Sequence, residues 1–180
     1  MYNSNQNYIS AKQYIIWAFM DLLGSKSFEV ISVKEIVKKA GISRSTFYLH
    51  FQDKFELMEF IRENITSKFL SFYDFDQKEK ETATSLISTT TINICQHIFE
   101  FRNFYQYEFD NPKFIQELSN ALALKLFQVY SDKSYAIFAS FGTIGYLTFW
   151  VKDNFQISPQ EAAKQLMKIG MTDWSKYNAK

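Results

Sequence analysis

The sequence contains few of the residues that form covalent or metal cross-links. Its 180 residues include one cysteine, Cys95, and two histidines. A lone cysteine cannot form an internal disulfide, and this set of residues offers no zinc-ligand spacing. We therefore expect no metal site and no cofactor. We also expect Cys95 to be an inert thiol, because no neighbouring cation is available to lower its pKa.

Helix-interrupting residues are also scarce, with two prolines and five glycines. Long stretches instead repeat apolar residues with the 3.6-residue period of an α-helix, which predicts an all-α fold of about nine helices. Asn111-Pro112 and Ser158-Pro159 each place a capping side chain before a proline at the first helical position. Both prolines are therefore expected to start helices rather than to interrupt them.

Neither an export signal nor a membrane span is evident in the sequence. The first ten residues, MYNSNQNYIS, are polar, and no run of 18 apolar residues occurs. Hydrophobic residues make up 47% and charged residues 22%, which is typical of a globular protein. We therefore expect a soluble cytoplasmic protein without membrane contact. The aromatic content of 18% is high enough to build a large core and to leave apolar surface for a partner or a small ligand.

Catalytic motifs and a strong overall charge are missing as well. The sequence shows no nucleophile paired with a base and no glycine-rich phosphate loop, so we do not expect an enzyme. The formal net charge is only +1, but the charge is unevenly distributed. Between Ser32 and Lys54, five cations stand against two anions, a local surplus of three positive charges. A local basic surface of this kind favours contact with nucleic acid.

The basic segment has the pattern of a helix-turn-helix at residues 32–52. A first helix is expected from about Ser10 to Leu23. Ser32-Val-Lys-Glu35 is a capping box that opens a short second helix, and Ala40-Gly41-Ile42-Ser43 is a tight break. Ser43 then caps a third helix of about two turns. Two short helices joined by a glycine-containing turn are typical of DNA-binding modules.

Apolar and polar residues are divided cleanly within this motif. A buried set can hold the two helices against the first one, namely Ile36, Val37, Ala40, Ile42, Phe47 and Phe51. Arg44 has the geometry for bidentate bonds to guanine, and Ser45 can reach a base edge or a phosphate. The predicted DNA-binding residues are Ser32, Lys34, Ser43, Arg44, Ser45, Thr46, Tyr48, His50 and Lys54.

Residues 9–60 resemble the DNA-binding domain of the TetR family, on the run ISVKEIVKKAGISRSTFYLHFQDKFEL. The resemblance implies a three-helix N-terminal domain whose residues matching Arg44 and Ser45 contact bases. It implies phosphate contacts for the residues matching Thr46, Tyr48, His50 and Lys54. One departure is Ser27, where many members carry glycine, and it affects only the conformation of the loop before Phe28.

The second half of the chain is expected to form a dimer. We place a DNA-binding domain at residues 1–53 and a domain for dimerisation and effector binding at 54–180. Residues 135–151 read as a helix that is apolar on every side and so needs cover on every side. Its two glycines are explained if another backbone approaches closely. Family members pair through their last two long helices, and the expected interface is Tyr135, Phe138, Gly142, Gly145, Phe149, Leu166, Met167 and Trp174.

An effector pocket is the least specific prediction. An apolar cavity with a few polar anchors could be lined by Asn93, Gln96, His97, Phe101, Tyr105, Phe127 and Tyr130. The alternative is that these residues form an ordinary aromatic core.

The sequence therefore predicts a homodimeric transcriptional regulator that binds double-stranded DNA at a palindromic operator. Repression is the commoner mode in the family, with release by a small apolar or aromatic effector, although activation is also open. The alternative is a coactivator with the same fold that acts through protein contacts without binding an operator.

Overall fold

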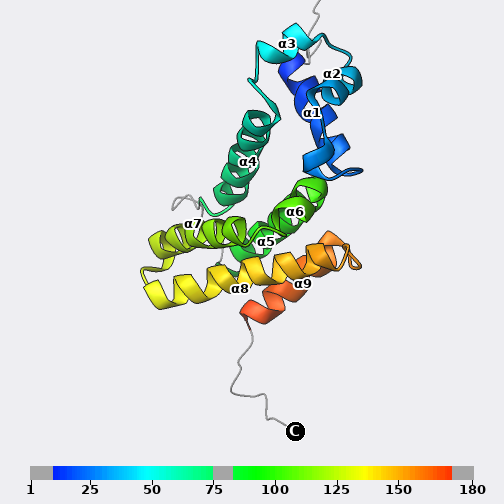
Figure 1. Ribbon diagram of the computed structural model, residues 1–180. Coiled ribbons are helices and arrows are strands. Elements are labelled where there is room, and N and C mark those ends of the chain that lie inside the picture. Colours follow the sequence, from blue (N-terminus) through cyan, green and yellow to red (C-terminus); the bar gives the residue numbers. More distant parts are fainter. Residues whose placement is uncertain (1–9, 75–82, 172–180) are drawn as a thin grey trace, which may run out of the picture. The chain divides into compact units, whose positions relative to one another are not determined.

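The computed structural model describes residues 10–74 and 83–171, and these are helical apart from their connecting segments (Figure 1). The all-α prediction of about nine helices is confirmed, because this part of the chain contains nine α-helices, a short 3-10 helix and no strand. The elements are α1 (Ala11–Leu23), η1 (Phe28–Val30), α2 (Val33–Ala40), α3 (Arg44–Tyr48), α4 (Lys54–Ser71), α5 (Ala83–Glu100), α6 (Arg102–Glu108), α7 (Pro112–Tyr130), α8 (Lys133–Lys152) and α9 (Pro159–Gly170).

The chain divides into two compact units between Asn64 and Ile65. This division falls within α4, so that helix contributes residues to both units. The first unit holds α1, α2 and α3 with the start of α4, and the second holds the remainder. The division of function that we expect, between residues 1–53 and 54–180, stays a prediction. Residues 73–82 are charged and have no sustained apolar stripe, so the sequence favours a linker there, and most of them lie outside the described residues.

Local capping determines where the helices of the first unit begin and end. Ser10 caps α1 in a capping box with Gln13, and the chain leaves the helix at Gly24. The face of α1 that packs against α2 and α3 buries Ile15, Ala18, Phe19 and Leu22. Gly41 ends α2 with φ +68°, a left-handed conformation that glycine adopts without strain. The predicted break at this position is therefore confirmed.

Two packed pairs of helices organise the second unit. α7 lies along α8, and α5 packs against α9 (Figure 1). Asn111 caps α7 by accepting a bond from Lys113 N–H, and Ser158 caps α9 by accepting one from Glu161 N–H. Each is followed by a proline at the start of its helix, as predicted. The core of this unit is strongly aromatic, and Trp150, Tyr105, Phe104 and Phe109 are fully buried.

Candidate nucleic-acid interface

The short helix α3 is anchored by one face and exposed on the other. Phe47 is completely buried and packs against Phe51, with ring centroids 6.0 Å apart. Ser43 caps the helix by accepting a bond from Thr46 N–H, and its hydroxyl also lies 2.7 Å from that of Ser45 and 2.8 Å from that of Thr46. This hydroxyl cluster places small polar groups at the N-terminal end of α3. Such groups can approach a base edge closely.

The other predicted contact residues of this helix lie at its surface. Arg44, Ser45, Tyr48 and His50 are exposed, and Thr46 is half-buried. The ring of Tyr48 packs edge-on against Phe47 at 5.5 Å, which steadies a side chain that is 56% exposed. The structure thus brings five polar side chains together on and beside one short helix. Their contacts with DNA stay predictions.

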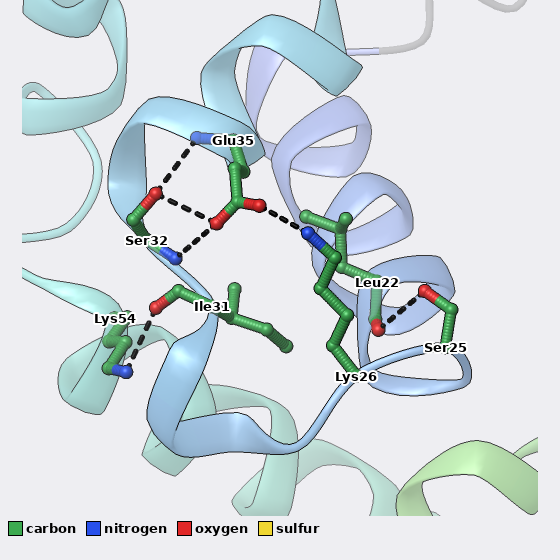
Figure 2. Close-up of polar contacts among 7 residues, drawn as sticks. All are labelled: Leu22, Ser25, Lys26, Ile31, Ser32, Glu35 and Lys54. Atoms are coloured by element: carbon green, nitrogen blue, oxygen red, sulfur yellow. Dashed lines mark hydrogen bonds and ion pairs between the residues drawn. The ribbon is translucent and has the colours of Figure 1, made fainter.

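The start of α2 is held by a network that ties three residues together (Figure 2). Ser32 Oγ accepts a bond from Glu35 N–H, and the Glu35 carboxylate in turn accepts from the backbone N–H and the hydroxyl of Ser32. Lys26 forms an ion pair with the same carboxylate. Lys26 and the Ser32 donors together lower the pKa of Glu35 to about 2. Lys26 connects the loop after α1 to this capping box, which sequence spacing did not reveal.

The hydroxyl of Ser32 is therefore already engaged within the chain, whereas Lys34 in the first turn of α2 is exposed. Lys38 is also exposed, and Lys39 pairs with Asp21 on α1. Part of the local positive charge is thus neutralised inside the unit. Lys34, Lys38 and Arg44 remain at the surface as cations that can meet a phosphate.

Lys54 makes contacts that the sequence did not predict. Its ammonium donates to the backbone carbonyls of Phe28, Glu29 and Ile31 at 2.7, 2.8 and 2.9 Å; the bond to Ile31 is drawn in Figure 2. It also lies 4.6 Å from the ring centroid of Phe28 and 5.5 Å from that of Phe55. A lysine ammonium has three N–H donors, and here all three are used. The phosphate contact that the family resemblance implies would require Lys54 to exchange a carbonyl for a phosphate oxygen.

The residues predicted to line an effector pocket fall into separate groups. Three of them, His97, Phe101 and Tyr105, lie together. The ring centroid of His97 is 4.9 Å from that of Phe101 and 5.9 Å from that of Tyr105. Burial lowers the pKa of His97 to about 4, although the ring also bonds to the Ile65 carbonyl at 3.2 Å. The remaining four residues are exposed, namely Asn93, Gln96, Phe127 and Tyr130. The ring centroids of Tyr130 and Tyr135 are 5.0 Å apart.

The predicted dimer residues on α8 lie at the surface of the chain. Phe138 is 73% exposed and Phe149 is 66% exposed, and Tyr135 is about half exposed. Gly142 and Gly145 are exposed as well, and a Cβ atom added to either would meet no heavy atom within 4 Å. On α9, Leu166 and Met167 are half-buried, while Trp174 lies outside the described residues. Packing among the described residues therefore does not explain either glycine.

Two further features concern other kinds of site. The described ranges contain no group of three or more His, Cys, Asp or Glu side chains that could hold a metal ion. They contain one helix, α8, whose length and apolar composition would suffice to cross a membrane. The core helix of a soluble protein meets the same criterion, so α8 by itself does not indicate a membrane protein.

Comparison with known proteins identifies the N-terminal unit. Residues 15–61 match the family model described as "Bacterial regulatory proteins, tetR family", and this range covers most of α1 to the first part of α4. This segment of the chain is similar to the DNA-binding part of TetR-family regulators. The first unit therefore contains a helix-turn-helix of the type found in this family of bacterial regulators, whose members are generally not enzymes.

Similar proteins agree with this family. The chain is 43% identical over 56 residues to the HTH-type dhaKLM operon transcriptional activator DhaS of Lactococcus lactis subsp. lactis (strain IL1403), covering 31% of this chain and 30% of that protein. It is 24% identical over 165 residues to the HTH-type transcriptional regulator YxbF of Bacillus subtilis (strain 168), covering 84% of this chain and 42% of that one. The chain thus spans less than half the length of either curated relative.

The whole fold is also shared with solved structures. The structure of a dihydroxyacetone kinase operon activator DhaS superposes with a TM-score of 0.70 at 20% identity, covering 95% of this chain and 99% of that one. At this level of identity the similarity shows the fold alone. The shared fold includes the helices of the second unit as well as the helix-turn-helix.

Proposed function

We propose that the protein acts as a homodimer that binds a palindromic operator, with α3 of each protomer in the major groove. The observation that carries this proposal is the division of α3 into a buried anchor, Phe47, and an exposed polar surface on the other side. A helix held by one face and polar on the other can enter the groove without disturbing its own unit. Two-fold symmetry of the protein would match the symmetry of the operator.

The contacts can be assigned by side-chain chemistry. Arg44 and Ser45 would read base edges, and Thr46, Tyr48 and His50 would bond to phosphates. Lys34 would add a phosphate contact from the first turn of α2, where backbone N–H groups also favour an anion. Ser32 and Ser43 would contribute mainly through their backbone, because their hydroxyls already cap α2 and α3.

The apolar surface of α8 supports dimerisation through α8 and α9. Two large aromatic rings and two glycines lie exposed on one helix, and an identical helix could approach closely at the glycines while it covers the rings. Pairing of this kind would also explain why one face of an apolar helix stays exposed although α7 covers another. In such a dimer α8 would be buried between protomers and would not lie in a membrane. We therefore also propose that the protein is cytoplasmic.

The dimer proposal has a matched pair of variants. Phe138→Asp places a charge in the proposed interface, and we expect it to shift the protein to monomers in sedimentation equilibrium. Leu124→Asp is the control, because Leu124 is 68% exposed on α7, outside the proposed surface. We expect that variant to stay dimeric. Dimers that survive Phe138→Asp, or are lost equally in both variants, would argue against α8 as the interface.

Operator binding is tested by selecting bound sequences from random DNA with the purified protein. We expect a palindromic sequence to be enriched. Arg44→Ala should then relax the preference at one base pair per half-site, at a cost of roughly 1–3 kcal/mol, and leave binding to random DNA nearly unchanged. Lys113→Ala serves as a control for the loss of a cation, because Lys113 is exposed on α7 in the second unit and is not among the proposed DNA contacts. An equal loss on selected and random DNA for Arg44→Ala would remove its base-reading role.

The sense of regulation has two candidates. Repression released by a small apolar or aromatic effector is the first, with the cluster of buried His97 and Tyr105 and half-buried Phe101 as the region to test for binding. The similarity to DhaS, which is named as a transcriptional activator, supports the second. A coactivator without an operator would show no retention in a gel shift at low salt, even with folded dimer present. Transcription in vitro from a template with the selected sequence would distinguish repression from activation.

A further inference from the structure

The exposed face of α3, opposite the buried Phe47, continues into an apolar side chain, Leu49. Leu49 follows the last residue of α3 and keeps its helical register, because its N–H donates to the Ser45 carbonyl at 3.1 Å and its backbone has φ −72° and ψ −20°. Residues two positions before and after a given residue lie roughly 160° around the helix from it. Ser45 and Leu49 therefore both lie opposite the buried Phe47 and point away from the core of the first unit.

Leu49 is 82% exposed, which is the highest value among the large apolar side chains that the structure describes. Its neighbour Tyr48 is more tightly held, because the Tyr48 ring packs edge-on against the ring of Phe47. A single exposed leucine is common on protein surfaces, so exposure alone carries no meaning. What matters is the position: Leu49 shares the groove-facing line of α3 with Ser45 and lies between the polar residues Tyr48 and His50.

We propose that Leu49 contacts the C5-methyl group of a thymine in the operator, an inference that rests on the proposed DNA binding by α3. Leucine has no donor or acceptor, so it cannot bond to a phosphate, and it would leave polar base edges unpaired if it covered them. The thymine methyl is the one apolar group that the major groove presents. Leu49 thereby acts as a specificity-determining residue.

The geometry also places the thymine relative to the other contacts. Ser45 and Leu49 are four residues apart, which is roughly 6 Å along a helix axis. Successive base pairs are roughly 3.4 Å apart along one strand. The thymine read by Leu49 thus lies within about two base pairs of the position read by Ser45. Burial of one methyl group corresponds to about a fourfold change in affinity for each half-site.

The test uses the full-length protein and its selected operator. Each thymine is replaced in turn by deoxyuridine, which lacks only the methyl group, at both symmetry-related positions. With the wild-type protein, one thymine position should show a loss of about fourfold per half-site. With Leu49→Ala, the same replacement should have no effect. Ser45→Ala is the matched control, and it should keep the sensitivity at that thymine.

The outcomes separate this inference from the proposed function. If no sequence is enriched from random DNA, operator binding itself fails. If the operator binds but no thymine is sensitive, or if Leu49→Ala keeps the full sensitivity, the methyl contact is overturned while operator binding stands. Circular dichroism melting of Leu49→Ala should match that of the wild type, because so exposed a side chain contributes little to the core.

Discussion

Lys54 offers the sharpest test of how the first unit is built. The ammonium bonds to three backbone carbonyls, at Phe28, Glu29 and Ile31, and so joins the start of α4 to the segment around η1. Lys54→Met keeps the apolar stem and removes the charge and all three donors. The variant thus isolates the polar contribution of this one side chain.

The magnitude follows from the surroundings of each bond. The bonds to Phe28 and Ile31 are partly buried, while the bond to Glu29 is exposed, so water can replace the last one at little cost. A hydrogen bond to a charged group contributes roughly 1.5–3 kcal/mol, and a surface cation–π contact adds roughly 0.5–1 kcal/mol. Because carbonyls that are partly open to water can be rehydrated, we expect a net loss of about 2–3 kcal/mol in the free energy of unfolding.

Urea unfolding of wild type, Lys54→Met and Lys34→Met measures this loss. Lys34 is exposed on α2, so its replacement should change stability by less than about 0.5 kcal/mol. The salt dependence of operator binding provides the second measurement. Lys34→Met should lower the slope of log affinity against log salt by about 1.8, as expected for one lost phosphate contact in each protomer of the dimer. Lys54→Met should leave that slope unchanged, because its donors are occupied.

The opposite pattern would refute this reasoning. If Lys54→Met were as stable as Lys34→Met and lowered the salt slope by a similar amount, Lys54 would be a phosphate ligand. The carbonyl contacts would then give way when DNA binds. That result would restore the role that the family resemblance implies for this lysine.

Three further predictions concern stability and reactivity. The pKa of His97 is about 4 in the folded protein and 6.5 ordinarily, so the unfolded chain binds more protons between these two values. The free energy of unfolding should therefore fall by about 2 kcal/mol from pH 7 to pH 5. His97→Gln should abolish this pH dependence in urea titrations. Gly41→Ala should cost about 1 kcal/mol through its positive φ alone, since an added Cβ meets no atom within 4 Å; an unchanged unfolding midpoint would contradict this. Burial raises the pKa of Cys95 to about 12, so a thiol reagent should react only after unfolding, and rapid labelling of the native protein would show otherwise.

Short-range patterns explain why much of the helix-turn-helix could be predicted. The caps at Ser32, Ser43, Asn111 and Ser158 all act within three residues along the chain, so the residues that start each helix stand side by side in the sequence. The break at Gly41 is equally local. The exposure of Arg44, Ser45 and Tyr48 followed from helical periodicity around the apolar Phe47. For these features the amino-acid sequence was sufficient.

Other features depend on contacts between residues far apart in the chain. The carbonyls bound by Lys54 lie 23 to 26 residues before it, and the Lys26–Glu35 pair spans a loop whose path no local pattern specifies. Of the residues predicted for a pocket, folding gathered His97, Phe101 and Tyr105 but left Asn93 and Gln96 on the surface.

The covered face of helix α8 also could not be predicted from the sequence. Its sequence is apolar on every side and therefore could not indicate which side the chain itself covers. The packing of α7 along α8 decided that, and it left Phe138, Gly142, Gly145 and Phe149 exposed. The sequence by itself thus determined the helices, their caps and the family of the DNA-binding unit, because these depend on neighbours in the chain. Tertiary structure decided which charges and which apolar faces remain available, because that depends on which distant segments pack together.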